Sequence, residues 1–177
     1  MSKEILRKKL INLRKVKFSN DSINFFKFKK VLNSLKLDKI NNIGGYYPIN
    51  SEIDCLGILK KLEINNLRIS LPVTRKYNSM DFYEWSFNEP LNISKIGIPE
   101  PSMEKKVYPD VLIVPLVGFD KNNFRLGYGG GFYDRYIKKI SNKKKVLTVG
   151  FGFSFQEINK IPINKFDQKL DIILTDK

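Results

Sequence analysis

Apolar and amphipathic segments alternate along this chain, and the strongest of them frame its C-terminal half. The longest apolar run, Val111-Leu-Ile-Val-Pro-Leu-Val117, predicts a buried strand. Gly118 ends the run, and Asp120-Lys-Asn-Asn123 predicts a turn. Further on, apolar residues recur at helical spacing and predict a helix that begins near Phe132. A strand, a turn and a helix are therefore expected in this order.

The rest of the pattern continues this alternation. Amphipathic periodicity predicts three more helices, and Asn20-Asp21-Ser22 and Asn50-Ser51 are placed to begin the second and third. Runs rich in β-branched and aromatic residues predict strands, two of them stopped by Pro48 and Pro72. The expected helices cover 3–18, 22–37 and 51–62, and the expected strands cover 43–47, 67–71, 146–149 and 170–175, with a further extended segment from Met80. This order predicts one α/β domain over 1–177 with a largely parallel sheet.

A glycine-rich stretch, Arg125-Leu-Gly-Tyr-Gly-Gly-Gly-Phe-Tyr-Asp-Arg135, joins the predicted strand to the predicted helix. Glycines permit positive φ and close approach of a ligand, and a helix start offers unpaired N–H groups and partial positive charge. This combination favours phosphate binding, with the flanking arginines as cations and Asp134 as a carboxylate for a metal. The stretch lacks the ending of a Walker A loop and the last glycine of G-x-G-x-x-G. The structural alternative is a turn that serves close packing only.

Composition narrows the possible chemistry. The chain has 177 residues, 42% hydrophobic and 28% charged, which is ordinary for one folded domain. It has a single cysteine, Cys55, and no histidine, which excludes internal disulfides, histidine-based triads and typical zinc sites. Neither a signal peptide nor a membrane-spanning run is visible, so we expect a cytoplasmic protein that does not bind membranes.

The formal net charge of +14 raises nucleic acid as a partner. The lysines are spread along the chain rather than gathered in one tail, so we expect no specific nucleic-acid binding. A basic surface also attracts anionic ligands such as nucleotides. Lys3, Arg7 and Arg14 follow one strip of the first predicted helix. They either edge a buried apolar stripe with their stems or bind an anion between them.

Three motifs resemble those of a known family. Val114-Pro-Leu-Val-Gly-Phe-Asp120, followed by the glycine-rich stretch, is similar to the signature of the 5-formyltetrahydrofolate cyclo-ligase family, also called 5,10-methenyltetrahydrofolate synthetases. Lys3-Glu-Ile-Leu-Arg7 resembles the family's N-terminal Lys-x-x-Leu-Arg motif, and Ile98-Pro-Glu-Pro101 resembles its link into the main strand. The resemblance covers nearly the whole chain. It implies a three-layer α/β/α sandwich with the glycine-rich loop at the carboxyl end of a strand.

The resemblance also implies an activity: the ATP-dependent cyclisation of 5-formyltetrahydrofolate to 5,10-methenyltetrahydrofolate, with ATP and Mg²⁺ as cofactors. The residues at matching positions then take the family's roles. These are Arg125 and Asp134 for catalysis; Lys3, Arg7, Arg125, Gly127, Gly129, Gly130, Gly131, Phe132 and Tyr133 for ATP; Tyr47, Glu52, Met80, Phe82 and Tyr133 for the folate; and Asp134 and Asp171 for Mg²⁺.

The chain departs from the family pattern in places, and other functions stay open. Phe166-Asp167 stands where many members have His-Asp, Gly130 where many have lysine, and Ile96 where some have an aromatic residue. One alternative is a nucleic-acid-binding protein, and another is a different phosphate-ligand enzyme, such as a sugar-phosphate isomerase, on the same scaffold. A monomer is expected.

Overall fold

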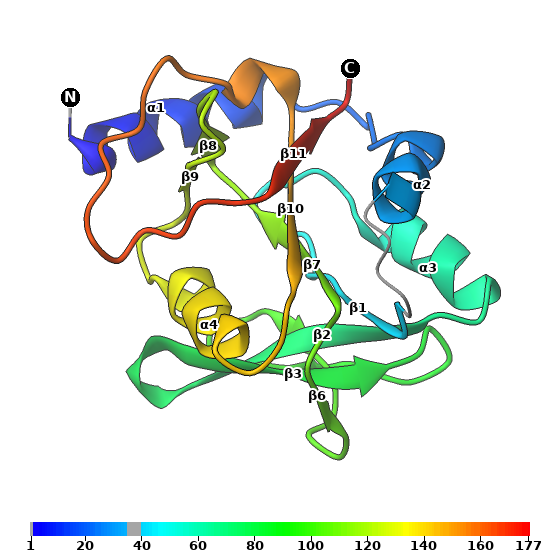
Figure 1. Cartoon of the computed structure of the whole chain (residues 1–177). Coiled ribbons are helices and arrows are strands. Elements are labelled where there is room, and N and C mark those ends of the chain that lie inside the picture. Colours follow the sequence, from blue (N-terminus) through cyan, green and yellow to red (C-terminus); the bar gives the residue numbers. More distant parts are fainter. Residues whose placement is uncertain (1, 35–39) are drawn as a thin grey trace.

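The structure, a computed structural model, describes residues 2–34 and 40–177. Its centre is a seven-stranded sheet with the strand order β11-β10-β7-β1-β2-β3-β6 (Figure 1). Five neighbouring strands run parallel, and β3 and β6 run antiparallel at one edge. The strands are β1 (Asn42–Gly44), β2 (Arg68–Arg75), β3 (Ser79–Trp85), β6 (Lys106–Val107), β7 (Val111–Pro115), β10 (Leu147–Gly152) and β11 (Ile172–Thr175). The predicted, largely parallel sheet is confirmed.

Helices cover both faces of the sheet, which gives the predicted three layers. On one face, α2 and α3 pack over the central strands, and on the other α4 does so (Figure 1). α1 instead packs on the segments that follow β7 and β10. The helices are α1 (Lys3–Val16), α2 (Phe25–Ser34), α3 (Leu56–Ile64) and α4 (Phe132–Ser141), with short 3-10 turns at η1 (Lys76–Asn78) and η2 (Ser154–Gln156).

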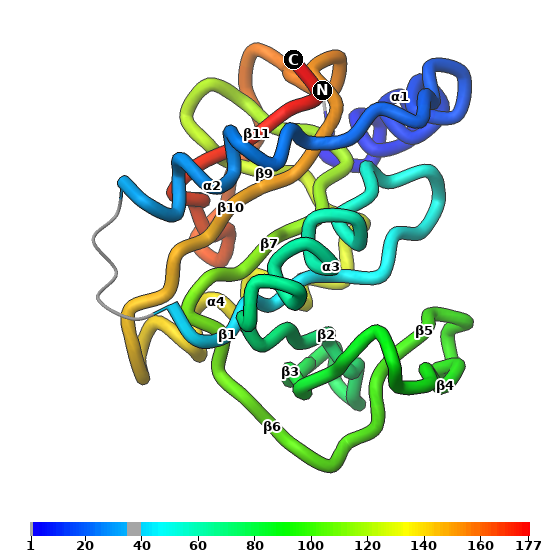
Figure 2. Tube along the Cα trace, turned by 90° about the vertical axis from the view of Figure 1, so that its right-hand side faces the viewer, coloured from blue at the N-terminus to red at the C-terminus, as the bar shows by residue number. Residues whose placement is uncertain are grey.

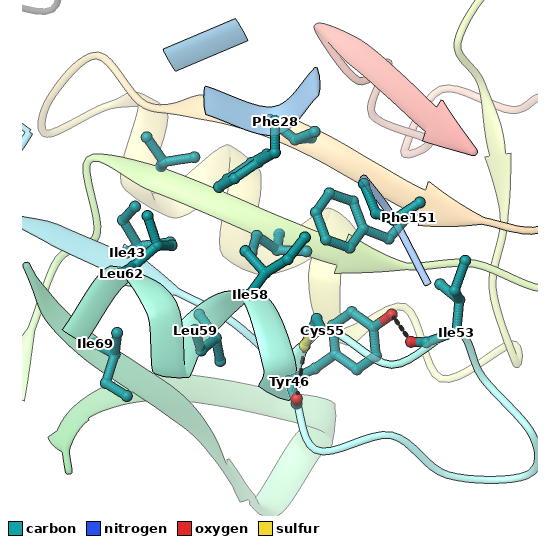
Figure 3. Packing of buried hydrophobic residues seen from close by; sticks show 14 of the residues in the cluster. Phe28, Ile43, Tyr46, Ile53, Cys55, Ile58, Leu59, Leu62, Ile69 and Phe151 are labelled. Atoms are coloured by element: carbon teal, nitrogen blue, oxygen red, sulfur yellow. Dashed lines mark hydrogen bonds between the residues drawn. The ribbon is translucent and has the colours of Figure 1, made fainter. Parts of the chain in front are cut away.

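Strand β7 is the middle one of the five parallel strands, and both of its faces are apolar. Val111 and Ile113 join the cluster under α2 and α3, whereas Leu112 and Val114 join the cluster under α4. All four side chains have no exposed surface. Figure 3 shows the first cluster, in which Cys55 points inward from the start of α3. A continuous apolar run suits a strand that is buried on both faces, because no position along it meets water.

The connections of the parallel strands determine where the sheet can bind a ligand. From β1 the chain passes through α3 to β2 on one side, and from β7 it passes through α4 to β10 on the other. Right-handed crossovers in opposite directions place the two helices on opposite faces. The connections therefore diverge between the neighbouring strands β1 and β7. A crevice outside the carboxyl ends of such strands is the usual ligand site of a sheet of this kind.

Two short hairpins extend the fold beside this crevice. β8 (Gly118–Phe119) pairs with β9 (Arg125–Leu126), and the predicted turn at Asp120–Asn123 joins them. The predicted strand over 111–117 therefore ends at Pro115, and Gly118 begins the first hairpin. β4 (Asn92–Ile93) pairs with β5 (Pro99–Glu100). In Figure 2, α1, the segment after β1 and the β4–β5 hairpin follow one another down the right-hand side.

Two helices begin later than their sequences predict. Helix α2 starts at Phe25 because Asn24 accepts hydrogen bonds from the N–H groups of Phe26 and Lys27, at 2.9 and 3.2 Å. The predicted end of this helix, at 35–37, lies outside the described residues. Helix α3 starts at Leu56 rather than at 51, because the Asp54 carboxylate accepts its first N–H at 2.8 Å. In both cases a side chain nearer the apolar stripe supplies the cap.

Pro72 does not end β2, contrary to the prediction for 67–71. β2 continues to Arg75, and Pro72 pairs with Phe82 of β3. The carbonyl of Ser70 accepts the N–H of Gly45 at 2.9 Å, so alternate residues of β2 turn toward β1. Pro72 has the same orientation, but β1 has already ended there, so no partner requires the missing N–H. The early end of β1 leaves a gap in the sheet at this position.

Candidate active site

The carboxyl ends of the parallel strands open into a cavity of about 840 Å³. This volume falls within the range of small-molecule sites. Five parts of the chain form most of its wall: the start of α1, the segment after β1, the paired strands β2 and β3 with the β4–β5 hairpin, the glycine-rich loop with the start of α4, and the segment 164–167. The lining residues are Lys3, Arg7, Tyr46, Tyr47, Ile49, Glu52, Pro72, Thr74, Met80, Ile96, Ile98, Pro99, Glu100, Pro115, residues 125–135, Lys138, Asn164, Phe166 and Asp167.

The glycine-rich loop brings its backbone to the cavity in a conformation that needs glycine. Gly129 has φ of 107° and Gly131 has φ of 67°, both in the region that L side chains avoid. Gly131 directly precedes α4, so the unpaired N–H groups of the first helical turn lie next to the loop. A Cβ atom on Gly127 would have no heavy atom within 4 Å. The loop therefore combines open space with a helix N-terminus, which suits phosphate.

Cationic side chains surround this loop. Arg7 of α1 donates its Nε hydrogen to the Gly127 carbonyl at 2.7 Å. Arg135 of α4 donates to the Gly130 carbonyl at 2.7 Å. Lys3 pairs with Asp167, with 2.5 Å between Nζ and Oδ2. The loop thus has positive charge on both sides, which would stabilise the charge of a nucleotide's phosphates.

Arg125 and Asp134 form a pair beneath the loop. An Arg125 guanidinium nitrogen lies 3.0 Å from a carboxylate oxygen of Asp134, and the residue Arg125 is only 8% exposed. Both side chains also bind the backbone of Gln168: Arg125 donates to its carbonyl at 3.1 Å, and Asp134 accepts its N–H at 2.9 Å. The pair therefore connects the start of α4 to the segment before β11. The positive charge of Arg125 and the negative charge of Asp134 largely neutralise each other.

The opposite end of the cavity is apolar and holds one buried carboxylate. Tyr47 and Met80 line this end, and Glu52 is 6% exposed with one oxygen accepting the Ile49 N–H at 3.0 Å. Desolvation raises the pKa of Glu52 to about 7, although the charge of Arg14 acts in the opposite direction. A carboxylate in an apolar slot is suited to hold a flat ligand that offers N–H donors.

Tyr133 provides a second polar group at this end. Its hydroxyl is buried and has no hydrogen-bond partner among the described residues, and the residue lines the cavity. Burial raises the pKa of Tyr133 well above its ordinary value, so the phenol remains protonated at neutral pH. A buried hydroxyl without a partner is costly, and a ligand that accepts its hydrogen bond would remove that cost.

Two predicted site residues do not line the cavity. Phe82 is fully buried under α4, where its ring lies 4.8 Å from that of Tyr136. Asp171 lies just before β11, at the amino end of the strand, and accepts hydrogen bonds from the N–H and hydroxyl of Thr148 at 2.8 and 2.7 Å. The other predicted residues do line it: Lys3, Arg7, Tyr47, Glu52, Met80, Arg125, Gly127, Gly129, Gly130, Gly131, Phe132, Tyr133 and Asp134.

The two carboxylates predicted to hold Mg²⁺ lie apart in the part of the chain that the structure describes. Within residues 2–34 and 40–177, no group of three or more His, Cys, Asp or Glu side chains is placed to hold a metal ion. Asp134 is engaged with Arg125, and Asp171 with Thr148. The structure thus does not bring Asp171 to the cavity, and the two carboxylates predicted to share Mg²⁺ have separate partners.

The sequence predicted no role for Asp167 or Lys138, which line the cavity. Asp167 holds Lys3, and Lys138 lines the wall beside Arg135. Arg14, which follows Lys3 and Arg7 along the same strip of α1, is 1% exposed. Helical periodicity placed Arg14 near the cations of α1, but periodicity alone does not distinguish a buried arginine from one that edges an apolar stripe.

The fold and the cavity define an α/β protein whose ligand cavity lies where the strand connections diverge. The chain belongs to the 5-formyltetrahydrofolate cyclo-ligase family, whose model matches residues 1–176. It is 32% identical over 150 residues to a 5-formyltetrahydrofolate cyclo-ligase of Haemophilus influenzae, covering 81% of this chain and 80% of that protein. It is 30% identical over 142 residues to the Escherichia coli K12 protein of the same name, covering 76% of this chain and 78% of that protein.

Solved structures agree with this assignment. A 5,10-methenyltetrahydrofolate synthetase from Mycoplasma pneumoniae superposes with a TM-score of 0.73 at 26% identity, covering all of both chains. The Aquifex aeolicus 5,10-methenyltetrahydrofolate synthetase superposes with a TM-score of 0.76 at 29% identity, covering all of this chain and 91% of that one. Family and fold are therefore as the sequence motifs predicted. In the part of the chain that the structure describes, no helix is long and apolar enough to cross a membrane.

Proposed function

We propose that this protein catalyses the ATP-dependent cyclisation of 5-formyltetrahydrofolate to 5,10-methenyltetrahydrofolate, with release of ADP and phosphate. One observation carries the proposal: a single cavity joins a cation-flanked glycine-rich loop to an apolar slot with a buried carboxylate. The first end suits a nucleotide and the second suits a pterin ring. Membership of the cyclo-ligase family supports the same pairing of ligands.

At the nucleotide end, the N–H groups of the loop and of the first turn of α4 would bind the phosphates. The open space over Gly127 allows them to approach the backbone. Arg7, Arg135 and Lys3 would supply positive charge around the γ-phosphoryl group during transfer. We assign Arg125 and Asp134 a positioning role, because each is satisfied by the other and by Gln168.

At the folate end, Tyr47, Met80 and Tyr133 would enclose the pterin ring, and Glu52 would accept hydrogen bonds from its N–H groups. The unpartnered hydroxyl of Tyr133 would donate to an acceptor of the substrate. Phe82 would not contact the folate; it would support the site by packing against Tyr136 of α4.

The reaction needs alignment more than covalent help from the protein. The formyl oxygen attacks the γ-phosphorus, a P–O bond forms, and the bond to the β,γ-bridging oxygen breaks with loss of ADP. N10 then attacks the activated formyl carbon and loses its proton, and phosphate leaves with the former formyl oxygen. A cavity that holds both substrates end to end supplies the required proximity. The absence of histidine fits a mechanism without a histidine acid or base.

Magnesium would enter with the nucleotide. Mg²⁺ commonly binds through substrate phosphates, water and one or two carboxylates rather than in an all-protein cage. Because Asp134 is engaged with Arg125 and Asp171 lies outside the cavity, we propose MgATP as the nucleotide substrate, with most of the coordination supplied by phosphates and water.

The direct test mixes the protein with MgATP and 5-formyltetrahydrofolate and follows the absorbance of the methenyl product. Product should form with all three components and fail to form when ATP or Mg²⁺ is left out. Parallel detection of ADP and phosphate distinguishes coupled ring closure from simple ATP hydrolysis. Folded protein that yields no methenyl product across neutral pH would refute the proposal.

A further inference from the structure

Arg14 is buried in an environment that a purely structural role does not explain. It is 1% exposed, and none of the ion pairs found among the described residues includes it. Its Nε atom is buried without a hydrogen-bond partner. One terminal nitrogen donates to the Leu116 carbonyl at 3.2 Å. A buried cation with so few partners is costly, so another interaction must compensate for its desolvation.

The remaining contacts of Arg14 lead from α1 to the substrate cavity. Its second terminal nitrogen donates to the hydroxyl of Tyr128, and the guanidinium carbon lies 5.6 Å from the centre of the Tyr128 ring. Tyr128 belongs to the glycine-rich loop and lines the cavity. The loop residue between the phosphate-binding glycines is thus held by a cation of α1.

Glu52 is an acidic group that lines the same cavity as Tyr128. It is also buried, and the ion pairs of the described residues do not include it. Both the charge of Arg14 and the hydroxyl of Tyr128 lower the pKa of Glu52, against the larger effect of desolvation. The pKa of Tyr128 is raised by its own desolvation and by Glu52. Tyr128 is therefore hydrogen-bonded to Arg14 and lines the same cavity as Glu52.

The other titratable groups that interact with Glu52 remain neutral near pH 7. Burial raises the pKa values of Tyr46, Tyr133 and Cys55 well above their ordinary values, and Glu52 contributes to each of these increases. Tyr46 and Cys55 come from the segment between β1 and α3, and Tyr133 comes from α4. Arg14 is therefore the charged side chain that favours the ionised form of Glu52.

We propose that Arg14 is a positioning residue of the folate site: it holds Tyr128 at the cavity wall and supplies the buried positive charge that favours the carboxylate form of Glu52. This inference rests on the proposed function for the role of the folate, but the hydrogen bond between Arg14 and Tyr128 and the burial of Arg14 and Glu52 are independent of it. Tyr128 belongs to the loop that would bind ATP, so Arg14 contacts the nucleotide end of the cavity as well.

The primary test measures the ionisation of Glu52 itself. The carboxyl carbon of Glu52 is followed by NMR in protein with ¹³C-labelled glutamate, and Glu52→Gln identifies its signal. Arg14→Met should move the titration midpoint up by about one pH unit or more, as expected when a nearby opposite charge is removed. Arg14→Lys should keep most of the original midpoint. Lys15→Met removes an exposed charge from the same helix and should leave the midpoint unchanged.

The second test measures the KM for 5-formyltetrahydrofolate as a function of pH. If the ionised carboxylate binds the folate, a shift of one pH unit raises this KM about fivefold at pH 7 in Arg14→Met and leaves it nearly normal at pH 9. An arginine that only supports the fold would raise KM equally at both pH values. That result, or an unchanged Glu52 midpoint, would overturn the inference.

Tyr128→Phe provides a second test in case Arg14→Met does not fold. It removes one hydroxyl and keeps the ring, and it should raise the Glu52 midpoint in the same direction by a smaller amount. A midpoint that stays at the wild-type value in folded Tyr128→Phe contradicts the shared role of the tyrosine. If wild-type protein forms no methenyl product, the proposed function fails, whereas the NMR titration still decides whether Arg14 controls Glu52.

Discussion

Burial of Glu52 predicts a pH-dependent loss of stability that glutamine should relieve. Desolvation raises the pKa of this carboxyl from 4.5 to about 7. A raised folded-state pKa means that the stabilising contribution is complete below the unfolded value of 4.5 and is lost as pH rises through about 7. The difference of 2.5 pH units corresponds to about 3 kcal/mol at 1.36 kcal/mol per unit. Because the residue is only 6% exposed, solvent screening reduces this figure little.

Glu52→Gln removes the charge, and its amide oxygen can still accept the Ile49 N–H. Below pH 4.5 we expect a constant difference between the free energies of unfolding of the mutant and the wild type. By pH 8 the free energy of unfolding of the mutant should have gained about 3 kcal/mol relative to that of the wild type. For a chain of this length the gain corresponds to roughly 6–12 °C in melting temperature. Urea unfolding at several pH values measures it, with the exposed Glu104→Gln as the control.

A difference between Glu52→Gln and wild type that stays constant from pH 5 to pH 8 would refute the reasoning. The same substitution should weaken folate binding, because the site loses its anionic acceptor. A mutant that is more stable and binds folate less well is the expected compromise of a functional site built around a buried charge.

Three further predictions concern the nucleotide end and the protein surface. Gly127→Ala should leave the melting temperature of the free protein nearly unchanged and raise the KM for MgATP, because its Cβ enters open space over the loop. Gly129→Ala should raise this KM and also lower the free energy of unfolding by roughly 1–3 kcal/mol, measured by urea unfolding, because alanine is strained at φ of 107°. Asp134→Asn should lower the free energy of unfolding by roughly 1–3 kcal/mol and should lower turnover, because Arg125 loses its buried partner. Asp171→Asn should leave turnover close to wild type, because Asp171 does not line the cavity. The net charge of +14 should give weak nucleic-acid binding that is independent of sequence and disappears at ~200 mM salt in filter or fluorescence assays.

The features that the sequence predicted well are those encoded by local chemistry. The glycine-rich loop was predictable because only glycine adopts the backbone of Gly129 and Gly131 without strain. The central strand was predictable because β7 is apolar on both faces. The family resemblance assigned Asp171 to Mg²⁺, but the sequence did not show that its carboxylate accepts hydrogen bonds from Thr148.

The missed features depend on where elements cross in space. Met80 and Phe82 point to the same face of β3, and only the crossing of α4 decides that the first meets the cavity and the second lies under Tyr136. The prediction ended a strand at Pro72 because proline lacks an N–H for the next strand. The sequence of β2 does not reveal that β1 ends before this position, so that no strand needs that N–H. Asp134 was predicted to hold a metal for a similar reason: Arg125 becomes its partner only after β9 and α4 pack.

The contact between Lys3 and Asp167 has a consequence for folding. These residues are 164 positions apart, and both line the cavity. Closing so long a loop costs entropy that only contacts formed elsewhere can offset, so this wall should assemble after the central sheet. Partly folded molecules with an intact β7–β10 core would then lack a complete nucleotide site. Protection of the chain by ATP would report the last stage of folding rather than the formation of the core.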